Sequence, residues 1–128
     1  MVHRIIEPFS PSPRSRGFTR YREPRQADRV LATVMMIALM EKTSLESVEP
    51  FLEPGQGTVG TRVDVSHCSA TPEGMKFRVD SELIEIDRRR LVFKVAAYDE
   101  RGLIGEGTHE RFIIDYDKFQ TKAEDKKL

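Results

Sequence analysis

The sequence contains no tryptophan, a single cysteine and no excess of charge of either sign. Because Cys68 has no second cysteine with which to pair, an internal disulfide framework is excluded and a reducing compartment, the cytoplasm, is expected. The 21 basic residues balance the 21 acidic ones, so no overall field attracts a nucleic acid or a membrane surface. No apolar run approaches the roughly 20 residues that span a bilayer. We therefore expect a protein that binds neither nucleic acid nor membranes.

Proline and arginine are concentrated at the N-terminal end. Residues 1–29 hold four of the seven prolines, and seven arginines against three acidic residues. This composition disfavours a packed core. We therefore expect residues 1–27 to form a poorly ordered arm, residues 28–119 to form one folded domain, and residues 120–128 to be a polar tail.

The most apolar stretch, residues 32–48, contains a glutamate. Apolar side chains recur there at three- and four-residue spacing, which predicts a helix over about residues 30–48 that ends before Pro50. Glu41 falls on the same predicted face as Ile37 and Leu45. Because burial of an unpaired carboxylate is costly, Glu41 is expected either to be paired or wetted by a cavity, or to face water at the edge of the stripe.

After the helix, apolar and polar residues alternate with the period of a β-strand. Strands are predicted over residues 58–67, 75–86, 91–98 and 103–115, with turns at 71–74, 87–89 and 99–102. The alternation changes phase after Leu83, which indicates a bulge. One helix followed by four antiparallel strands predicts an α+β domain in which a sheet wraps around a helix.

His67 is predicted on the inward face of its strand, together with Val63 and Val65. It cannot pair with Cys68, because adjacent strand residues point to opposite faces. Glu41 and His67 thus point toward the core from separate elements, and we expect them to approach a common region, within one subunit or across a symmetric interface. Such a pocket suits general-base or nucleophilic chemistry, whereas a satisfied core histidine is the structural alternative.

Two further patterns are excluded as sites. Residues 55–60, "GQGTVG", match the dinucleotide-binding glycine motif, but they follow a helix and enter a strand, which is the reverse of the required order. The three histidines, at positions 3, 67 and 109, lack the spacing of metal ligands, so no metal is expected.

Four motifs resemble the fluoroacetyl-CoA thioesterase-like family of hotdog-fold thioesterases. They are "AT…MIALME", "TVGT.VDV.H…ATP.G", "RRL.F.V.A.D" and "IGEGTHER", and together they cover roughly residues 30–119. The resemblance implies a hotdog fold, in which a curved antiparallel sheet wraps a long central helix. It also implies a homodimer with acyl-thioester sites at the subunit interface, and leaves open whether dimers associate further.

The resemblance also implies a set of site residues. The family's catalytic threonine, glutamate and histidine fall on Thr33, Glu41 and His67, and a glycine near the acyl thioester falls on Gly60. The implied reaction is hydrolysis of a small or medium acyl-CoA to the free acid and CoA, without a cofactor. Glu41 would be a nucleophile or a base that activates water. His67 would relay protons or orient the attacking group, and Thr33 would hydrogen-bond the carboxylate or the carbonyl oxygen.

The sequence departs from the family near its N-terminus. Fluoroacetyl-specific members carry aromatic residues shortly before the threonine, but residues 22–33 hold none, so fluoroacetyl selectivity is not expected. Neither "RIIEPF" nor "GFTRYRE" is a good match for the family's first strand, which would leave a sheet edge uncovered.

Other interpretations stay open at this stage. His109 and Arg111 are expected to have a structural or interface role, and residues 88–90 either contact CoA phosphates or form a solvated hairpin. The alternative functions are a non-catalytic hotdog module that binds an acyl thioester or only dimerises, and a hotdog hydratase, whose motifs are absent.

Overall fold

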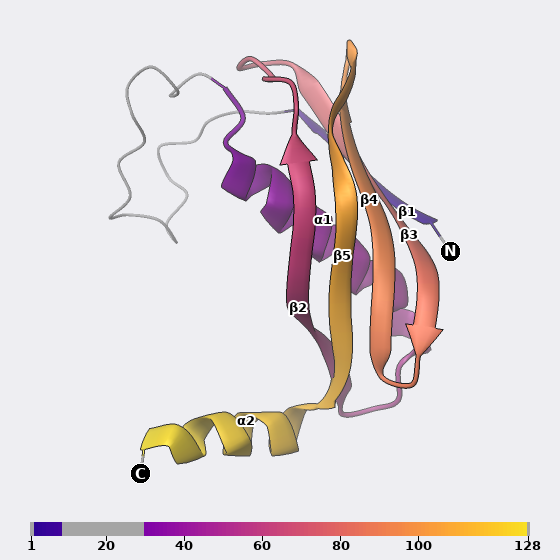
Figure 1. The fold of residues 1–128 in the computed structure, drawn as a ribbon, viewed down its shortest axis with the longest axis vertical. Coiled ribbons are helices and arrows are strands. Elements are labelled where there is room, and N and C mark those ends of the chain that lie inside the picture. The colour runs from indigo at the N-terminus through magenta and orange to yellow at the C-terminus, as the bar shows by residue number, and fades with distance from the viewer. Residues whose placement is uncertain (1, 9–29, 128) are drawn as a thin grey trace.

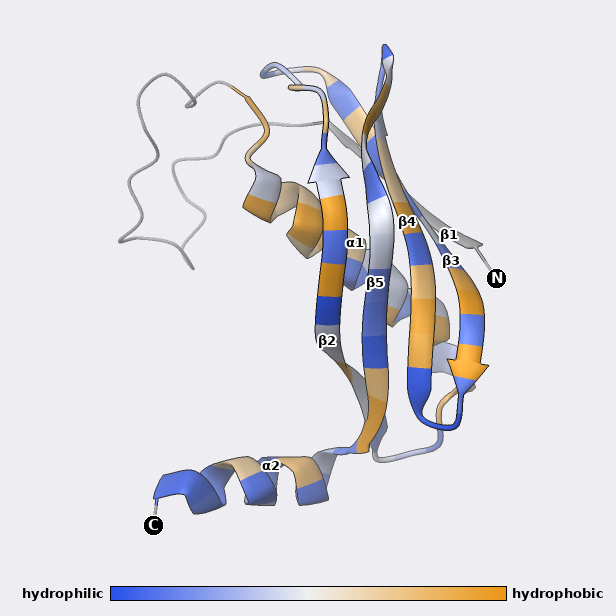
Figure 2. Ribbon diagram, in the orientation of Figure 1, coloured by the Kyte–Doolittle hydropathy of each residue, from blue (hydrophilic) through white to orange (hydrophobic). Residues whose placement is uncertain are grey.

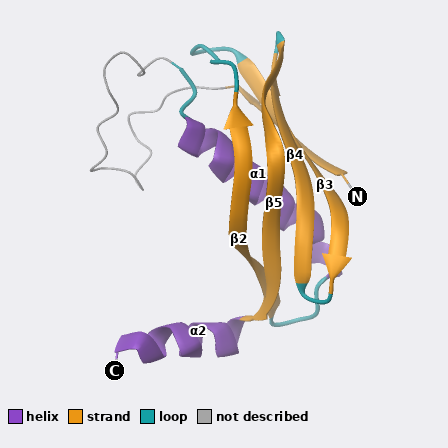
Figure 3. Ribbon diagram, in the orientation of Figure 1, coloured by secondary structure: helices purple, strands orange, loops and turns teal. Residues whose placement is uncertain are grey.

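The computed structural model describes residues 2–8 and 30–127, with side chains described for residues 30–127. Its elements, in chain order, are β1 (Val2–Pro8), α1 (Thr33–Val48), the 3-10 helix η3 (Glu49–Phe51), β2 (Gln56–His67), β3 (Lys76–Asp87), β4 (Arg90–Asp99), β5 (Gly102–Asp115), α2 (Tyr116–Glu124) and the 3-10 helix η4 (Asp125–Lys127). The strands form one curved sheet, and α1 lies across one of its faces (Figure 1). This arrangement confirms the predicted α+β hotdog fold (Figure 3).

The sheet has the strand order β1-β3-β4-β5-β2, and every neighbouring pair is antiparallel. The three predicted turns are present. Each of them contains a residue with positive φ: Gly74 at 87°, Arg88 at 59° and Gly102 at 139°. The pairing of β3 with β4 shifts between Leu83 and Glu85, which confirms the bulge predicted after Leu83.

A second bulge, not predicted, interrupts β2 between Gly60 and Arg62. Gly60 pairs with Arg111, whereas Val63 pairs with His109 and His67 with Gly105. The extra residue reverses the alternation of side chains, so Gly60 and His67 lie on the same face of the sheet although seven positions separate them. Unbroken alternation predicts that Val59 and Thr61 share the face of His67, but Val59 pairs with Phe112 and lies on the opposite face, and Thr61 is the extra residue of the bulge.

The face of α1 that packs on the sheet also differs from the predicted one. Its buried residues are Met36, Leu39, Met40, Thr43, Ser44, Ser47 and Val48. Val34 is 54% exposed, and Glu41 is half-buried at the edge of the packed face. Because the first half of the helix is apolar nearly all round, spacing alone does not define the inward side.

The Ser44 hydroxyl fits into the packed face of α1 because it finds hydrogen-bond partners nearby. The Ser44 hydroxyl donates to the carbonyl oxygen of Met40 at 2.9 Å and lies 2.8 Å from Ser81 Oγ of β3. A serine in this position satisfies its hydrogen bonds within the helix and across to the sheet, so its polarity does not oppose burial.

The hydrophobic core lies between α1 and the inner face of the sheet. Its strand residues include Phe77, Val79, Phe93, Val95 and Ala97, each less than 10% exposed. Buried and more exposed residues alternate along β4, because one side of that strand faces α1 and the other faces solvent. In β2 the hydropathy itself alternates between apolar and polar residues (Figure 2). The outer face of the sheet carries charged residues instead.

Both ends of the chain contain elements that the sequence did not predict. Residues 2–8 form β1, which pairs with β3 from Val2↔Glu82 to Pro8↔Lys76, so the arm predicted over residues 1–27 contains a strand. Residues 9–29 lie outside the described residues. At the other end, residues predicted as a polar tail are helical in α2 and η4, and α2 projects away from the sheet (Figure 1). No helix in the described part of the chain is long and apolar enough to cross a membrane.

Candidate functional site

Thr33 and His67 form a hydrogen-bonded pair. Thr33 is the first residue of α1 and His67 the last of β2, and Thr33 Oγ1 lies 2.8 Å from His67 Nδ1. The other ring nitrogen, Nε2, is buried and has no hydrogen-bond partner among the described residues. If Nδ1 carries the proton, Nε2 presents a lone pair, which is the form that a general base requires.

Glu41 lies with a different set of residues, around Gly60. A Cβ atom added to Gly60 would lie 3.3 Å from Glu41 Oε1, 3.3 Å from Arg111 Nη1 and 3.2 Å from His109 Cε1. Three polar side chains therefore surround the position that a side chain would occupy. Because glycine leaves this position open, a small group of a ligand can approach the carboxylate and the guanidinium there.

His109 and Arg111 are the residues near this position that the sequence did not identify as part of a site. They are 1% and 5% exposed and lie on the helix-facing side of β5. Burial, together with the charge of Arg111, lowers the pKa of His109. Burial also lowers the pKa of Arg111, and the nearby Glu41 carboxylate opposes that shift. One feature of the sequence could have drawn attention to them: they are two positions apart in a predicted strand, which places both side chains on the same face of that strand.

The structure thus brings the four predicted site residues together as two pairs. Thr33 contacts His67, and Glu41 approaches Gly60, but no hydrogen bond within the described residues joins the two pairs. Along α1 the Cα atoms of Thr33 and Glu41 are about 12 Å apart, given the rise of an α-helix. Within one copy of the chain, therefore, Glu41 and His67 do not form a single hydrogen-bonded cluster.

The other candidate residues are accounted for by the fold. Cys68 is exposed, and no group of three potential metal ligands occurs among the described residues. Arg90 contacts Glu110 and Glu85, which raise its pKa, and Arg89 contacts Asp115 at 3.7 Å. Two of the three arginines at residues 88–90 are thus engaged in ion pairs on the protein itself.

The chain is similar to known thioesterases over most of its length. The family model for fluoroacetyl-CoA-specific thioesterase matches residues 17–117. A fluoroacetyl-CoA thioesterase from Streptantibioticus cattleyicolor is 43% identical over 97 residues, which are 76% of this chain and 70% of that protein.

Solved structures agree with this similarity. A variant of the fluoroacetyl-CoA thioesterase in complex with acetyl-CoA superimposes with a TM-score of 0.88 at 34% identity, covering 100% of this chain and 97% of that one. A thioesterase superfamily member from Thermus thermophilus gives a TM-score of 0.84 at 26% identity, covering 99% and 90%. The chain therefore belongs to the fluoroacetyl-CoA-specific thioesterase family and is a thioester hydrolase of the hotdog fold.

Proposed function

We propose that this protein hydrolyses a small or medium acyl-CoA to the free acid and CoA, with Thr33, Glu41 and His67 as catalytic residues and Gly60 beside the acyl thioester. The observation that carries the proposal is the Thr33–His67 pair, which leaves His67 Nε2 buried and without a partner among the described residues. A buried imidazole nitrogen without a partner is costly unless a ligand or another group engages it. The acetyl-CoA complex of the relative supports CoA as the thiol carrier.

We further propose that two copies of the chain complete the site. Strand β2 is at an edge of the sheet. Exposed apolar side chains lie on it at Val63, and in the first turn of α1 at Val34 and Met35, next to the Thr33 that contacts His67. An uncovered strand edge beside apolar surface favours pairing with another chain. A symmetric dimer formed by antiparallel pairing of two β2 strands covers both features.

This pairing joins the two half-sites. If the twofold axis passes between Val63 and Asp64, Gly60 of one copy lies opposite His67 of the other, because both are equally far from the axis. Glu41, which lies beside Gly60, then approaches the Thr33–His67 pair of the second copy. A composite site accounts for the separation of Glu41 from His67 within one chain.

Two chemical roles are consistent with Glu41 in this site. As a nucleophile, its carboxylate attacks the thioester carbonyl and the CoA thiolate leaves. Water then hydrolyses the mixed anhydride, while His67 Nε2 takes a proton from that water and passes it to the thiolate. As a general base, it removes a proton from water that attacks the carbonyl directly, and His67 relays this proton to the CoA thiolate as the C–S bond breaks. In both cases the Thr33 hydroxyl orients the imidazole. The reaction as proposed requires only these side chains and water.

The test is thiol release from a panel of acyl-CoAs that includes acetyl-, fluoroacetyl- and longer acyl groups. We expect turnover by the wild type, and losses of at least about 100-fold for Glu41→Ala and His67→Ala with unchanged melting temperature. Equal activity of Glu41→Ala and wild type would refute the proposed mechanism. Consumption of an enoyl-CoA without thiol release would indicate a hydratase, and ligand-dependent thermal stabilisation without turnover would indicate a binding module.

A mixing experiment tests the composite site separately. Glu41→Ala and His67→Ala chains are unfolded together and refolded as a one-to-one mixture. If each site uses Glu41 from one copy and His67 from the other, a mixed dimer contains one intact site, and about a quarter of wild-type activity returns. No recovery, with mixed dimers verified by mass, would place both residues of each site in the same chain.

A further inference from the structure

His109 and Arg111 are buried ionisable residues to which the proposed chemistry assigns no step. They lie side by side on the inner face of β5, and the ring of His109 stacks on Phe93 with centroids 6.3 Å apart. Burial of a guanidinium and an imidazole is unfavourable, because both groups lose their hydrogen bonds to water. Their hydrogen bonds show what each of them holds in place.

The tautomer of His109 is determined by the backbone of β2. Its Nδ1 lies 2.8 Å from the carbonyl oxygen of Arg62. A carbonyl oxygen only accepts hydrogen bonds, so Nδ1 carries the proton and donates it. Because burial and the Arg111 charge lower the pKa of the ring, the ring is neutral at pH 7 and Nε2 has a free lone pair.

Arg111 uses that lone pair. Its Nη1 donates to His109 Nε2 at 3.2 Å, while Nε donates to Thr58 Oγ1 and Nη2 to the Thr58 carbonyl oxygen, both at 2.8 Å. All three nitrogens of the guanidinium are therefore held, and its plane cannot rotate. Nη1 is also the atom that approaches the open position over Gly60, across from Glu41.

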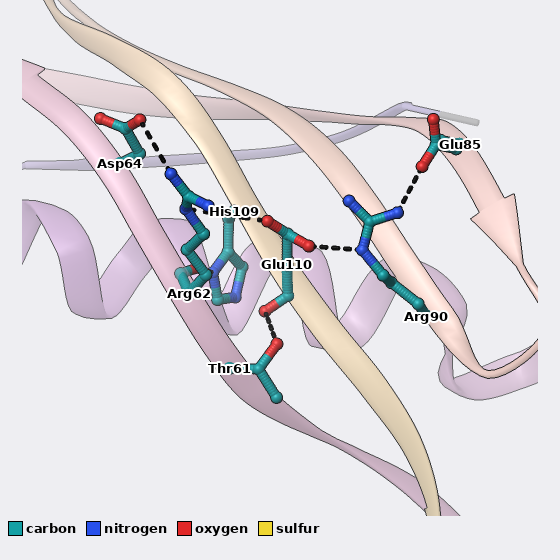
Figure 4. Close-up of polar contacts among 7 residues, drawn as sticks. All are labelled: Thr61, Arg62, Asp64, Glu85, Arg90, His109 and Glu110. Atoms are coloured by element: carbon teal, nitrogen blue, oxygen red, sulfur yellow. Dashed lines mark hydrogen bonds and ion pairs between the residues drawn. The ribbon is translucent and has the colours of Figure 1, made fainter.

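The carbonyl that orients His109 is supplied by the β2 bulge, and a set of contacts on the outer face of the sheet holds the bulge (Figure 4). The Thr61 hydroxyl donates to the Glu110 carbonyl oxygen at 3.2 Å. The Glu110 carboxylate lies between Arg90, at 2.6 Å, and Arg62, at 3.8 Å. These contacts link β2, β5 and β4 at the residues that flank the bulge.

We propose that His109 is a positioning residue that acts through Arg111: the Arg62 carbonyl at the bulge fixes His109 as the Nδ1–H tautomer, and His109 Nε2 then holds the Arg111 guanidinium over Gly60, facing Glu41. This inference rests on the proposed function, since it assigns His109 to the same site. Protonation of His109 removes the acceptor and places two cations side by side. The charged groups near the ring are Arg111 and Glu110 on β5 and Glu41 on α1.

Two substitutions at His109 separate its two hydrogen bonds. The amide of asparagine replaces Nδ1 and reaches the Arg62 carbonyl but not Arg111, whereas the amide of glutamine replaces Nε2 and offers Arg111 an oxygen acceptor. We expect His109→Asn to lower kcat about 30- to 100-fold with KM nearly unchanged, because a displaced guanidinium no longer faces the reacting groups. We expect the kcat of His109→Gln to lie closer to that of the wild type than to that of His109→Asn when the three values are compared on a logarithmic scale.

Folding and tautomer are measured in the same samples. Melting temperatures of the two variants are expected to agree within a few degrees, and ¹⁵N NMR of the wild type at pH 7 is expected to show His109 protonated at Nδ1 only. Equal kcat for the two variants, loss that follows the melting temperature, or a proton on Nε2 would each overturn the inference. Absence of thiol release by the wild type would instead overturn the proposed function, whereas normal turnover with the wrong tautomer overturns the positioning role alone.

Discussion

At the scale of single residues, Gly60 shows how a missing side chain defines a site. The backbone of Gly60 has no positive φ, so its conformation alone does not require glycine. The space above it does, because Glu41, Arg111 and His109 all lie within 3.3 Å of a Cβ placed there. The sequence motif identified Gly60 through family resemblance, whereas the coordinates give the physical reason for it.

Gly60→Ala tests this reason. The added methyl group occupies the open position, and we expect kcat/KM to fall at least about tenfold, equivalent to ~1.4 kcal/mol of transition-state stabilisation. The melting temperature is expected to fall by no more than a few degrees, because an L-residue can adopt this backbone and the three neighbouring side chains need to move only slightly to admit a methyl group. Ser66→Ala, on the outer side of the same strand, is the control. An alanine variant as active as the wild type would show that the substrate does not use this space.

Thr43 and Thr71 form a matched pair for stability. Both are fully buried, but Thr71 Oγ1 donates to Asp99 Oδ2 at 3.0 Å, whereas Thr43 Oγ1 has no partner among the described residues. We expect Thr43→Val to raise the free energy of unfolding by about 1 kcal/mol and Thr71→Val to lower it by about 1–2 kcal/mol. Urea unfolding measures both, and effects of the same sign would contradict the assignment of partners.

At the scale of elements, β2 and α1 show what the sequence could and could not predict. Period-two alternation located every strand from β2 onward, and the phase change after Leu83 located one bulge. The bulge at Gly60 was missed because Val59 keeps an even spacing with Val63 and Val65 in the sequence, although it lies on the opposite face of the sheet. The inward face of α1 was assigned incorrectly, because serine and threonine at the packed face give no apolar signal.

The candidate site was predictable only in part for a related reason. The sequence pattern predicted that Glu41 and His67 lie on a helix and a strand that pack together. It could not show that Glu41 approaches Gly60 whereas His67 contacts Thr33.

His109 and Arg111 were predicted to have a structural role, because the alternation along one strand does not show which residues of the neighbouring strand lie opposite. The sequence therefore could not show that Arg111 lies opposite a glycine. The pairing of Gly60 with Arg111 was needed to bring them into the site.

Helix α2 makes a distinct prediction for the end of the chain. None of its residues is buried, and its first residue is tied to the domain through the Tyr116 N–H, which donates to the Gly55 carbonyl oxygen at 3.0 Å. We expect deletion of residues 117–128 to change the melting temperature by less than about 3 °C, since exposed residues contribute little to stability. A larger decrease would show that α2 packs against a second copy.

At the scale of the whole molecule, His109 couples stability to pH. Its pKa in the folded protein lies below its ordinary value of 6.5, so the unfolded chain binds a proton more readily than the folded one. The stabilisation is fully present above pH 6.5 and is lost as pH falls toward the lowered pKa. We expect the free energy of unfolding to decrease over this range in the wild type and to decrease less in His109→Gln. Identical slopes would show that His109 is not buried as a neutral ring.

The position of β2 at the edge of the sheet has a consequence for how such a protein can change. The strand that carries Gly60 and His67 is also the strand available to a second chain, so one stretch of twelve residues governs reactivity and self-association together. A substitution that shifts the register between copies would move every reacting group at once. Among related proteins with this arrangement, we expect changes in acyl-group preference to arise from substitutions in α1 and in the loops, while the sequence of β2 changes little.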